Sequence, residues 1–138
     1  MISARSAEKQ ARKGLENYLG GALKDVEVNV KEGEGSISLS IKFKVDEGEI
    51  RSGGEVRKVI PGDYEMEVEV TFGKRGSNMI EARFFGKCKD SQLSDMYVVE
   101  EGKLDNVRSW LADKIGALAV QCSSQAEESA DIGGVLGW

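Results

Sequence analysis

The chain has no histidine among its 138 residues. Histidine is the side chain used most often as a general base near neutral pH and as a ligand of transition metals. A catalytic site would therefore depend on carboxylates, cysteine, lysine or tyrosine, and the sequence assembles none of these into a catalytic motif. We expect a protein that is not an enzyme and that binds no metal and no cofactor.

Cysteine is scarce as well. Cys88 and Cys122 are the only two, too few and too far apart for a disulfide framework or a four-ligand zinc site. Both fall at positions expected to face the core, so we expect two buried, reduced thiols. The alternative is a bridge, which requires their Cα atoms to lie within about 7 Å. Reduced thiols favour a cytoplasmic location.

Long apolar runs are missing too. No stretch approaches the roughly 20 residues that cross a bilayer, and the N-terminal "MISARSAEKQ" lacks the apolar core of a secretory signal. We therefore expect a soluble chain without an export address. The net charge of −5 disfavours nucleic acid and anionic membranes as partners, because both attract clustered lysine and arginine.

The length favours one domain, and the apolar and charged fractions of 40% and 31% are ordinary for a folded protein. We expect a single domain over residues 1–125. Residues 126–138 then form a C-terminal tail that is first acidic and then apolar.

The period of the apolar residues predicts the elements of this domain. Helical spacing occurs from Ser3 to Lys24 and from about Gly102 to Gln125. Apolar and polar residues alternate between them, over residues 26–31, 36–45, 64–72 and 79–88, with residues 95–100 as a short fifth strand. This order predicts an α+β fold: an N-terminal helix, an antiparallel meander of four to five strands, and a long C-terminal helix packed across one face of the sheet.

Residues 46–63 interrupt the meander. They are charged, rich in glycine and contain the only proline, Pro61. The segment is either a long loop or a small hairpin arm that turns at residues 52–54, with Ile50, Val56 and Val59 as weak apolar positions.

Three glutamates, Glu65, Glu67 and Glu69, alternate with apolar residues in "YEMEVEVTF". A metal site would need carboxylates that converge on one point, and residues two apart on a strand are separated by nearly 7 Å, given a rise of about 3.4 Å per residue. We instead expect a solvated face of ion pairs. The apolar faces allow a register that pairs Lys31 with Ser36, Lys44 with Glu65, Lys42 with Glu67 and Ser40 with Glu69. Across the next pair, Arg83 can lie opposite Glu67 and Lys87 near Glu65, and a shift of two residues is also allowed there.

Two surfaces are candidates for binding a partner. Phe85 and Met79 share the outer face with the glutamates, next to a strip of small serines. The C-terminal "DIGGVLGW" carries four apolar residues that would be unfavourable in water: Ile132, Val135, Leu136 and Trp138. This tail either folds back on its own domain or docks on another molecule.

Two functions are consistent with these features. The first is a non-catalytic protein-binding domain, such as an adaptor, a small chaperone or an assembly subunit, whose partner is another protein or a second copy of the chain. The second is a carrier that holds an apolar small molecule or lipid between sheet and helices, near Tyr64, Met66, Phe84 and Trp110. The small inward residues Ala82 and Gly86 would leave room for such a ligand.

Overall fold

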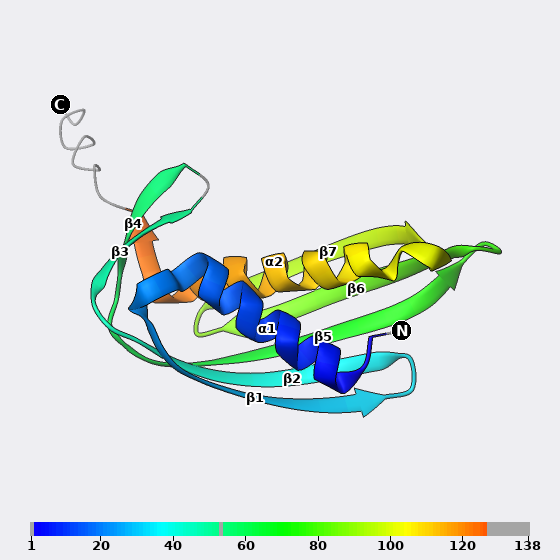
Figure 1. Ribbon diagram of the computed structural model, residues 1–138, viewed down its shortest axis with the longest axis horizontal. Coiled ribbons are helices and arrows are strands. Elements are labelled where there is room, and N and C mark those ends of the chain that lie inside the picture. Colours follow the sequence, from blue (N-terminus) through cyan, green and yellow to red (C-terminus); the bar gives the residue numbers. More distant parts are fainter. Residues whose placement is uncertain (1, 53, 127–138) are drawn as a thin grey trace.

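The computed structural model describes residues 2–52 and 54–126, which form two long helices on one face of an antiparallel sheet (Figure 1). The helices are α1 (Ala4–Leu19) and α2 (Leu104–Ser123). Short 3₁₀ turns, η1 (Gly20–Ala22) and η2 (Glu101–Lys103), follow α1 and precede α2. The expected α+β class and the order helix, meander, helix are confirmed.

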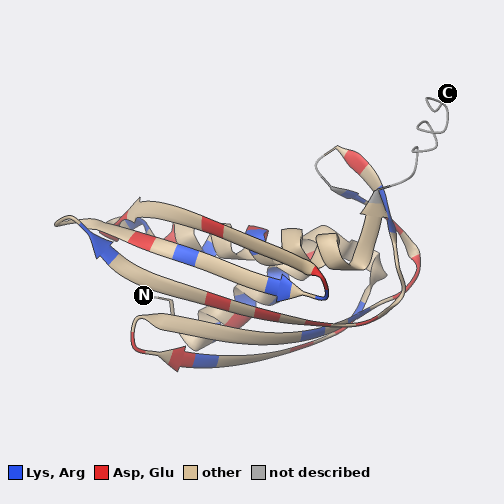
Figure 2. Ribbon diagram, turned by 180° about the vertical axis from the view of Figure 1, so that it is seen from behind, with Lys and Arg blue, Asp and Glu red and all other residues tan. Residues whose placement is uncertain are grey.

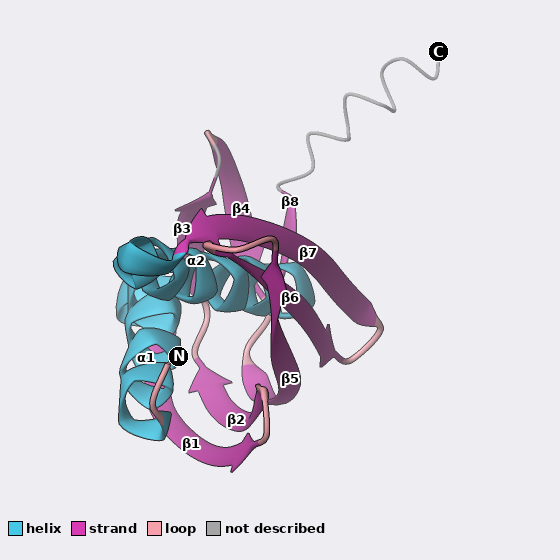
Figure 3. Ribbon diagram, turned by 90° about the vertical axis from the view of Figure 1, so that its right-hand side faces the viewer, coloured by secondary structure: helices cyan, strands magenta, loops and turns pink. Residues whose placement is uncertain are grey.

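The main sheet has five strands in the order β1-β2-β5-β6-β7, and every neighbouring pair is antiparallel. Figure 3 shows that this sheet curves around the two helices. The strands are β1 (Leu23–Gly33), β2 (Ser36–Val45), β5 (Gly62–Arg75), β6 (Met79–Cys88) and β7 (Ser91–Glu100).

Alternation along the strands separates the core from the solvent. In β5, Tyr64, Met66, Val68 and Val70 are buried beneath the helices, whereas the glutamates between them are exposed. The apolar stripe of α2 closes the core from the other side, with Val107, Leu111, Ile115 and Leu118 fully buried. The faces predicted from the period of two and from the helical stripe are therefore correct.

Residues 46–63 contain a hairpin arm, which was one of the two expected alternatives. Its strands, β3 (Gly48–Ser52) and β4 (Glu55–Val59), pair with each other. A third short strand, β8 (Ser124–Ala126), which the sequence pattern does not predict, pairs with β4. The expectation of weak apolar positions was wrong for Ile50 and Val59, which are 8% and 1% exposed and belong to the main core.

Both helices end earlier in the chain than the sequence predicts. The first helix ends at Leu19 rather than near Lys24, because Gly20 adopts a positive φ of 52° and its N–H bonds to the carbonyl of Glu16. The second helix ends at Ser123, where the chain becomes extended and enters β8. Residue 126, expected to begin the tail, is the last residue of β8. Within the described residues, neither helix has the length and hydropathy that a membrane crossing requires.

The expected strand registers were wrong by two residues or more. Lys42 lies opposite Glu65 rather than Glu67, and Lys31 lies opposite Ser38 rather than Ser36. Across the β5–β6 pair, Glu67 faces Lys87, and Arg83 faces Thr71. A shift of two residues keeps every side chain on its face, so the pattern of buried residues could not distinguish these registers.

The expectation of reduced thiols was wrong. Cys88, the last residue of β6, and Cys122, near the end of α2, form a disulfide with a Cα separation of 5.7 Å. Each cysteine faces the core, as expected, and the two meet because α2 lies across the sheet at this point. The bridge therefore fixes the last turn of α2 to the end of β6.

Candidate docking surface

The outer face of the sheet, seen in Figure 2, carries both signs of charge along its strands. All three glutamates of β5 point out from it and are exposed. Glu65 pairs with Lys42 at 3.8 Å, and Glu67 accepts a hydrogen bond from the hydroxyl of Ser40 at 3.0 Å. Glu69 lies between Ser38 and Phe85. The three carboxylates are thus spread along a strand and do not converge on one point.

The cation expected beside these glutamates on β6 has another partner. Arg83 forms an ion pair with Glu81, two residues away on its own strand, with its Nε 2.6 Å from the carboxylate. Among the described residues, no group of three or more possible metal ligands is found. The outer face therefore resembles a solvated surface of short, local ion pairs, each of which contributes little to stability.

An apolar patch interrupts this charged face at β6 and β7. Phe85 is 43% exposed and Met96 is 46% exposed, two of the three large apolar side chains among the described residues that are classed as exposed. Phe85 lies opposite Ser94, so Met96 is its diagonal neighbour across the β6–β7 pair. Val98 is two residues beyond Met96 and points from the same face. We call Phe85, Met96 and Val98 the outer patch.

The opposite side of β7 carries a second group of aromatic residues. Tyr97 stacks on Trp110 of α2 with ring centres 5.6 Å apart, and both rings are only partly buried. Asp95 accepts hydrogen bonds from Lys114 at 2.8 Å and from the indole of Trp110 at 3.3 Å. The bond from Lys114, with that from the backbone N–H of Met96, lowers the pKa of the Asp95 carboxyl below its usual value. β7 is therefore flanked by apolar side chains on both of its faces.

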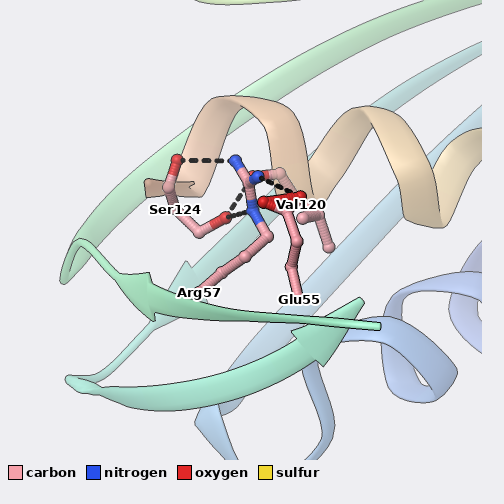
Figure 4. A network of polar contacts seen from close by, with 4 residues as sticks. All are labelled: Glu55, Arg57, Val120 and Ser124. Atoms are coloured by element: carbon pink, nitrogen blue, oxygen red, sulfur yellow. Dashed lines mark hydrogen bonds and ion pairs between the residues drawn. The ribbon is translucent and has the colours of Figure 1, made fainter. Parts of the chain in front are cut away.

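The arm is attached to the end of α2 through Arg57, as Figure 4 shows. Its Nε donates to the hydroxyl of Ser124 at 2.8 Å, and its Nη2 donates to the carbonyl of Ser124 at 3.3 Å. The Ser124 hydroxyl in turn donates to the carbonyl of Val120 at 2.6 Å. Glu55 approaches the same guanidinium at 3.7 Å. At the end of α2, Arg57 thus satisfies the carbonyl of Ser124, and the Ser124 hydroxyl satisfies that of Val120.

Phe85 and Met79, which the sequence assigns to one binding surface, lie apart in the structure. Phe85 belongs to the outer patch, but Met79 is the first residue of β6, six residues away, and is only partly exposed. The candidate residues of the tail, Ile132, Val135, Leu136 and Trp138, lie outside the described residues. Met96 was missed, because residues 95–100 were recognised as a strand without an assignment of its faces.

The residues of the alternative ligand site are packed in the core. Tyr64, Met66 and Phe84 are at most 2% exposed, and Phe84 makes an edge contact with Trp110 at 6.2 Å. The room expected at Gly86 is filled, because a Cβ on this residue would lie 2.6 Å from Cδ2 of Leu118. Gly86 therefore allows close packing of α2 on the sheet rather than leaving space for a ligand.

Comparison with known proteins gives no relative: no family model, no curated protein and no solved structure matches this chain.

Proposed function

We propose that this chain is a non-catalytic protein-binding domain, an adaptor, small chaperone or assembly subunit, which acts through the outer face of its sheet, the arm of residues 46–63 or the C-terminal tail. The observation that carries the proposal is the outer patch. Phe85 and Met96 are nearly half exposed and are diagonal neighbours, and outside the outer patch the exposed residues of this face are mainly charged or polar. Burial of two such side chains against a partner is favourable at about 25 cal/mol for each Å² of apolar surface.

The arm supports the same proposal from another side of the molecule. It projects from the end of the fold where α2 ends (Figure 1). Ile60, just beyond β4, is 37% exposed. Because Arg57 and β8 fix this arm to α2, a partner that contacts the arm would meet a surface of defined shape.

A capture experiment with surface variants tests the proposal. The full chain is used as bait in extract from its native cells, beside the variants Phe85→Asp and Met96→Asp, a truncation after residue 126, and the control Asn29→Asp. Asn29 is exposed on the same face of the sheet, on β1. We expect a protein that the full chain and the control retain and that at least one of the other variants loses. Equal retention of every protein by all five baits would refute the proposal.

The carrier of an apolar small molecule remains a second proposal. Tyr64, Met66, Phe84 and Trp110 would contact the ligand only after α2 moves away from the sheet, because Leu118 fills the space beside Gly86. Native mass spectrometry of protein purified from its own cells separates the two functions. A bound lipid of constant mass would favour the carrier and count against a purely protein-binding role. The net charge of −5 leads us to propose no role in binding nucleic acid or membranes.

A cytoplasmic location also remains a proposal, and the disulfide provides its test. Disulfides are rare in cytosolic proteins because thiol reductants keep cysteines reduced. Both cysteines are nearly inaccessible, with exposures of 1% and 8%, so free thiols are measured after the protein has been unfolded in denaturant. Alkylation in lysed native cells, before and after reduction, measures the fraction bridged. A fully bridged population would count against the cytoplasm.

A further inference from the structure

The two edges of the main sheet are protected very differently. β1 carries five exposed charged side chains: Lys24, Asp25, Glu27, Lys31 and Glu32. Helix α1 also bonds to this edge, because Arg12 donates to the carbonyl of Val26 at 3.2 Å and the Glu32 carboxylate accepts from the N–H of Ala4 at 2.6 Å. Charges and covering elements of this kind prevent an edge strand from pairing with another chain.

β7, at the other edge, is contacted by α2 on its inner face but lacks the row of exposed charges that β1 carries. Of its ten residues only Asp95 and Glu100 are charged, and Asp95 is already bound to Lys114 and Trp110. Within the described residues, β7 pairs with β6 alone and is the last strand of its sheet. Its side chains beside the edge are Met96 and Val98 on the outer face, with Leu93 and Tyr97 on the inner face. A long edge strand with apolar residues on both faces is suited to strand pairing.

The backbone indicates which residues of β7 would form the new hydrogen bonds. In an antiparallel sheet, alternate residues direct both N–H and C=O toward the same neighbouring strand. The N–H of Glu101 bonds to the carbonyl of Asn78, whereas the N–H of Met96 bonds to the carboxylate of Asp95. Odd-numbered residues therefore face β6, and the even-numbered residues from 92 to 100 face the free edge.

We propose that β7 pairs with β7 of a second copy of this chain, antiparallel and centred on Met96. This names the partner of the outer patch and so rests on the function proposed above. The two five-stranded sheets become one continuous sheet with a two-fold axis at Met96. The N–H of Met96 exchanges the Asp95 carboxylate for a carbonyl of the second copy, while Asp95 keeps Lys114 and Trp110. The facing pairs on the outer side are Met96 with Met96, Ser94 with Val98 and Gln92 with Glu100; on the inner side they are Leu93 with Val99 and Asp95 with Tyr97.

This register is favoured over its neighbours because no like charges face each other. Centring one residue earlier would place Asp95 against Asp95, which is destabilising for like charges on opposite strands. If the two-fold axis lay one residue later, at Tyr97, the paired segment would shorten from residues 92–100 to residues 94–100. In the proposed register, Met96 and Val98 of both copies gather around the axis. On β6 of each copy, Phe85 is the diagonal neighbour of Met96, and Arg83 lies directly opposite Met96. The outer patch is thus self-complementary.

Sedimentation equilibrium of the purified full chain between about 1 and 100 μM tests the pairing, since a dimer of this kind depends on concentration. We expect the mass to rise from one chain to two. Met96→Lys should abolish the rise, because two lysines would face each other across the axis. The control Asn29→Lys introduces the same charge on the outer face of β1 and should leave the rise unchanged. Circular dichroism confirms that each variant is folded.

A mixing experiment tests the register. Met96→Glu alone should also be monomeric, whereas a mixture of Met96→Lys and Met96→Glu should form dimers of mixed composition, because opposite charges then face each other. A monomeric full chain, a dimer that survives Met96→Lys, or a mixture that stays monomeric would each overturn the proposal. None of these results overturns the binding function itself. That function fails only if the capture experiment finds no protein whose retention depends on the outer patch or the tail.

Discussion

Gly14 of α1 rests directly on the backbone of Ala112 in α2, and a Cβ at Gly14 would overlap the carbonyl oxygen of Ala112. The same crossing is repeated one turn further along, where a Cβ on Gly116 would overlap the ring of Tyr18. The two helices can lie this close because each contributes a residue without a side chain. Their contact forms the layer that covers the core of the sheet.

We expect Gly14→Ala to destabilise the fold. Alanine improves the intrinsic helix propensity by about 1 kcal/mol, but the overlap is with backbone atoms that cannot rotate away. The helices must therefore separate, and overpacking of this kind lowers the free energy of unfolding by about 1–3 kcal/mol. Chemical denaturation measures the change. Gly21→Ala is the control, because nothing lies within 4 Å of the Cβ it adds. Equal stabilities of the two variants would contradict the close crossing.

Removal of the Cys88–Cys122 bridge should lower stability substantially. The bridge joins residues 34 apart in the sequence, and closure of a loop of this length restricts the unfolded chain by about 3–4 kcal/mol. We expect urea to unfold the reduced protein, and the double variant Cys88→Ala with Cys122→Ala, at a clearly lower concentration than the oxidised protein. The two forms without the bridge should behave alike. Labelling of two thiols in the denatured, unreduced protein would show that no bridge exists.

The strand faces could be predicted from the sequence, but the strand register, the disulfide and β8 could not. The faces of β2, β5 and β6 were predictable, because side chains alternate strictly along a strand and apolar residues occupy alternate positions. The register was not, since Lys42 can face Glu65 or Glu67 without any change of face. The disulfide depends on the distance between β6 and α2, which no local pattern encodes. β8 is three residues long, too short for any alternation to be recognised.

The candidate surface was predictable to a similar degree. Phe85 was identified as an apolar residue on a charged face, because its neighbours in sequence fix the parity of β6. Met96 could be recognised only once it was known which side chains of β7 point to the outer face. Its closeness to Phe85 follows from the pairing of Phe85 with Ser94. The unequal protection of the two sheet edges depends on contacts between α1 and β1, such as Arg12 to Val26, that lie 14 residues apart.

A pH dependence is expected from Tyr18. Burial, followed by the hydrogen bond to Asp113 and the negative charge of that carboxylate, raises the pKa of Tyr18 from its usual value of 10.0 to about 12. The folded protein therefore holds the phenolic proton more tightly than the unfolded chain does. This contribution to stability is fully present below pH 10 and is lost as the pH rises from about 10 to 12.

Tyr18→Phe isolates this contribution. The variant should be less stable than the parent at neutral pH by about 1 kcal/mol, the typical value of one hydrogen bond. The difference should shrink as the pH approaches 12, while losses caused by other groups affect both proteins equally. Denaturation curves of the two proteins at several pH values give this difference directly. A difference that stays constant from pH 8 to pH 12 would show that Tyr18 titrates alike in the folded and unfolded states.

The attachment of the arm should depend on Arg57. Arg57→Met keeps the aliphatic stem but removes the donors to Ser124, one to its hydroxyl and one to its carbonyl. Since hydrogen bonds from a charged group contribute about 1.5–3 kcal/mol and this side chain is 19% exposed, we expect the arm to open more easily by about 1–2 kcal/mol. Hydrogen exchange at the amide of Ile60, which bonds to the carbonyl of Ser123 at 2.7 Å, reports on that opening.

The control for this experiment is Lys58→Met, which removes a neighbouring cation whose side chain is exposed and bonded to none of these groups. Exchange at Ile60 should accelerate about tenfold in the Arg57 variant, as a change of 1.4 kcal/mol implies, and should not change in the control. Exchange in the centre of β5 should be equal in all three proteins, because the main sheet does not depend on Arg57. Faster exchange throughout the fold would instead mean that arm and sheet unfold as one unit, so the arm could not open separately to admit a partner.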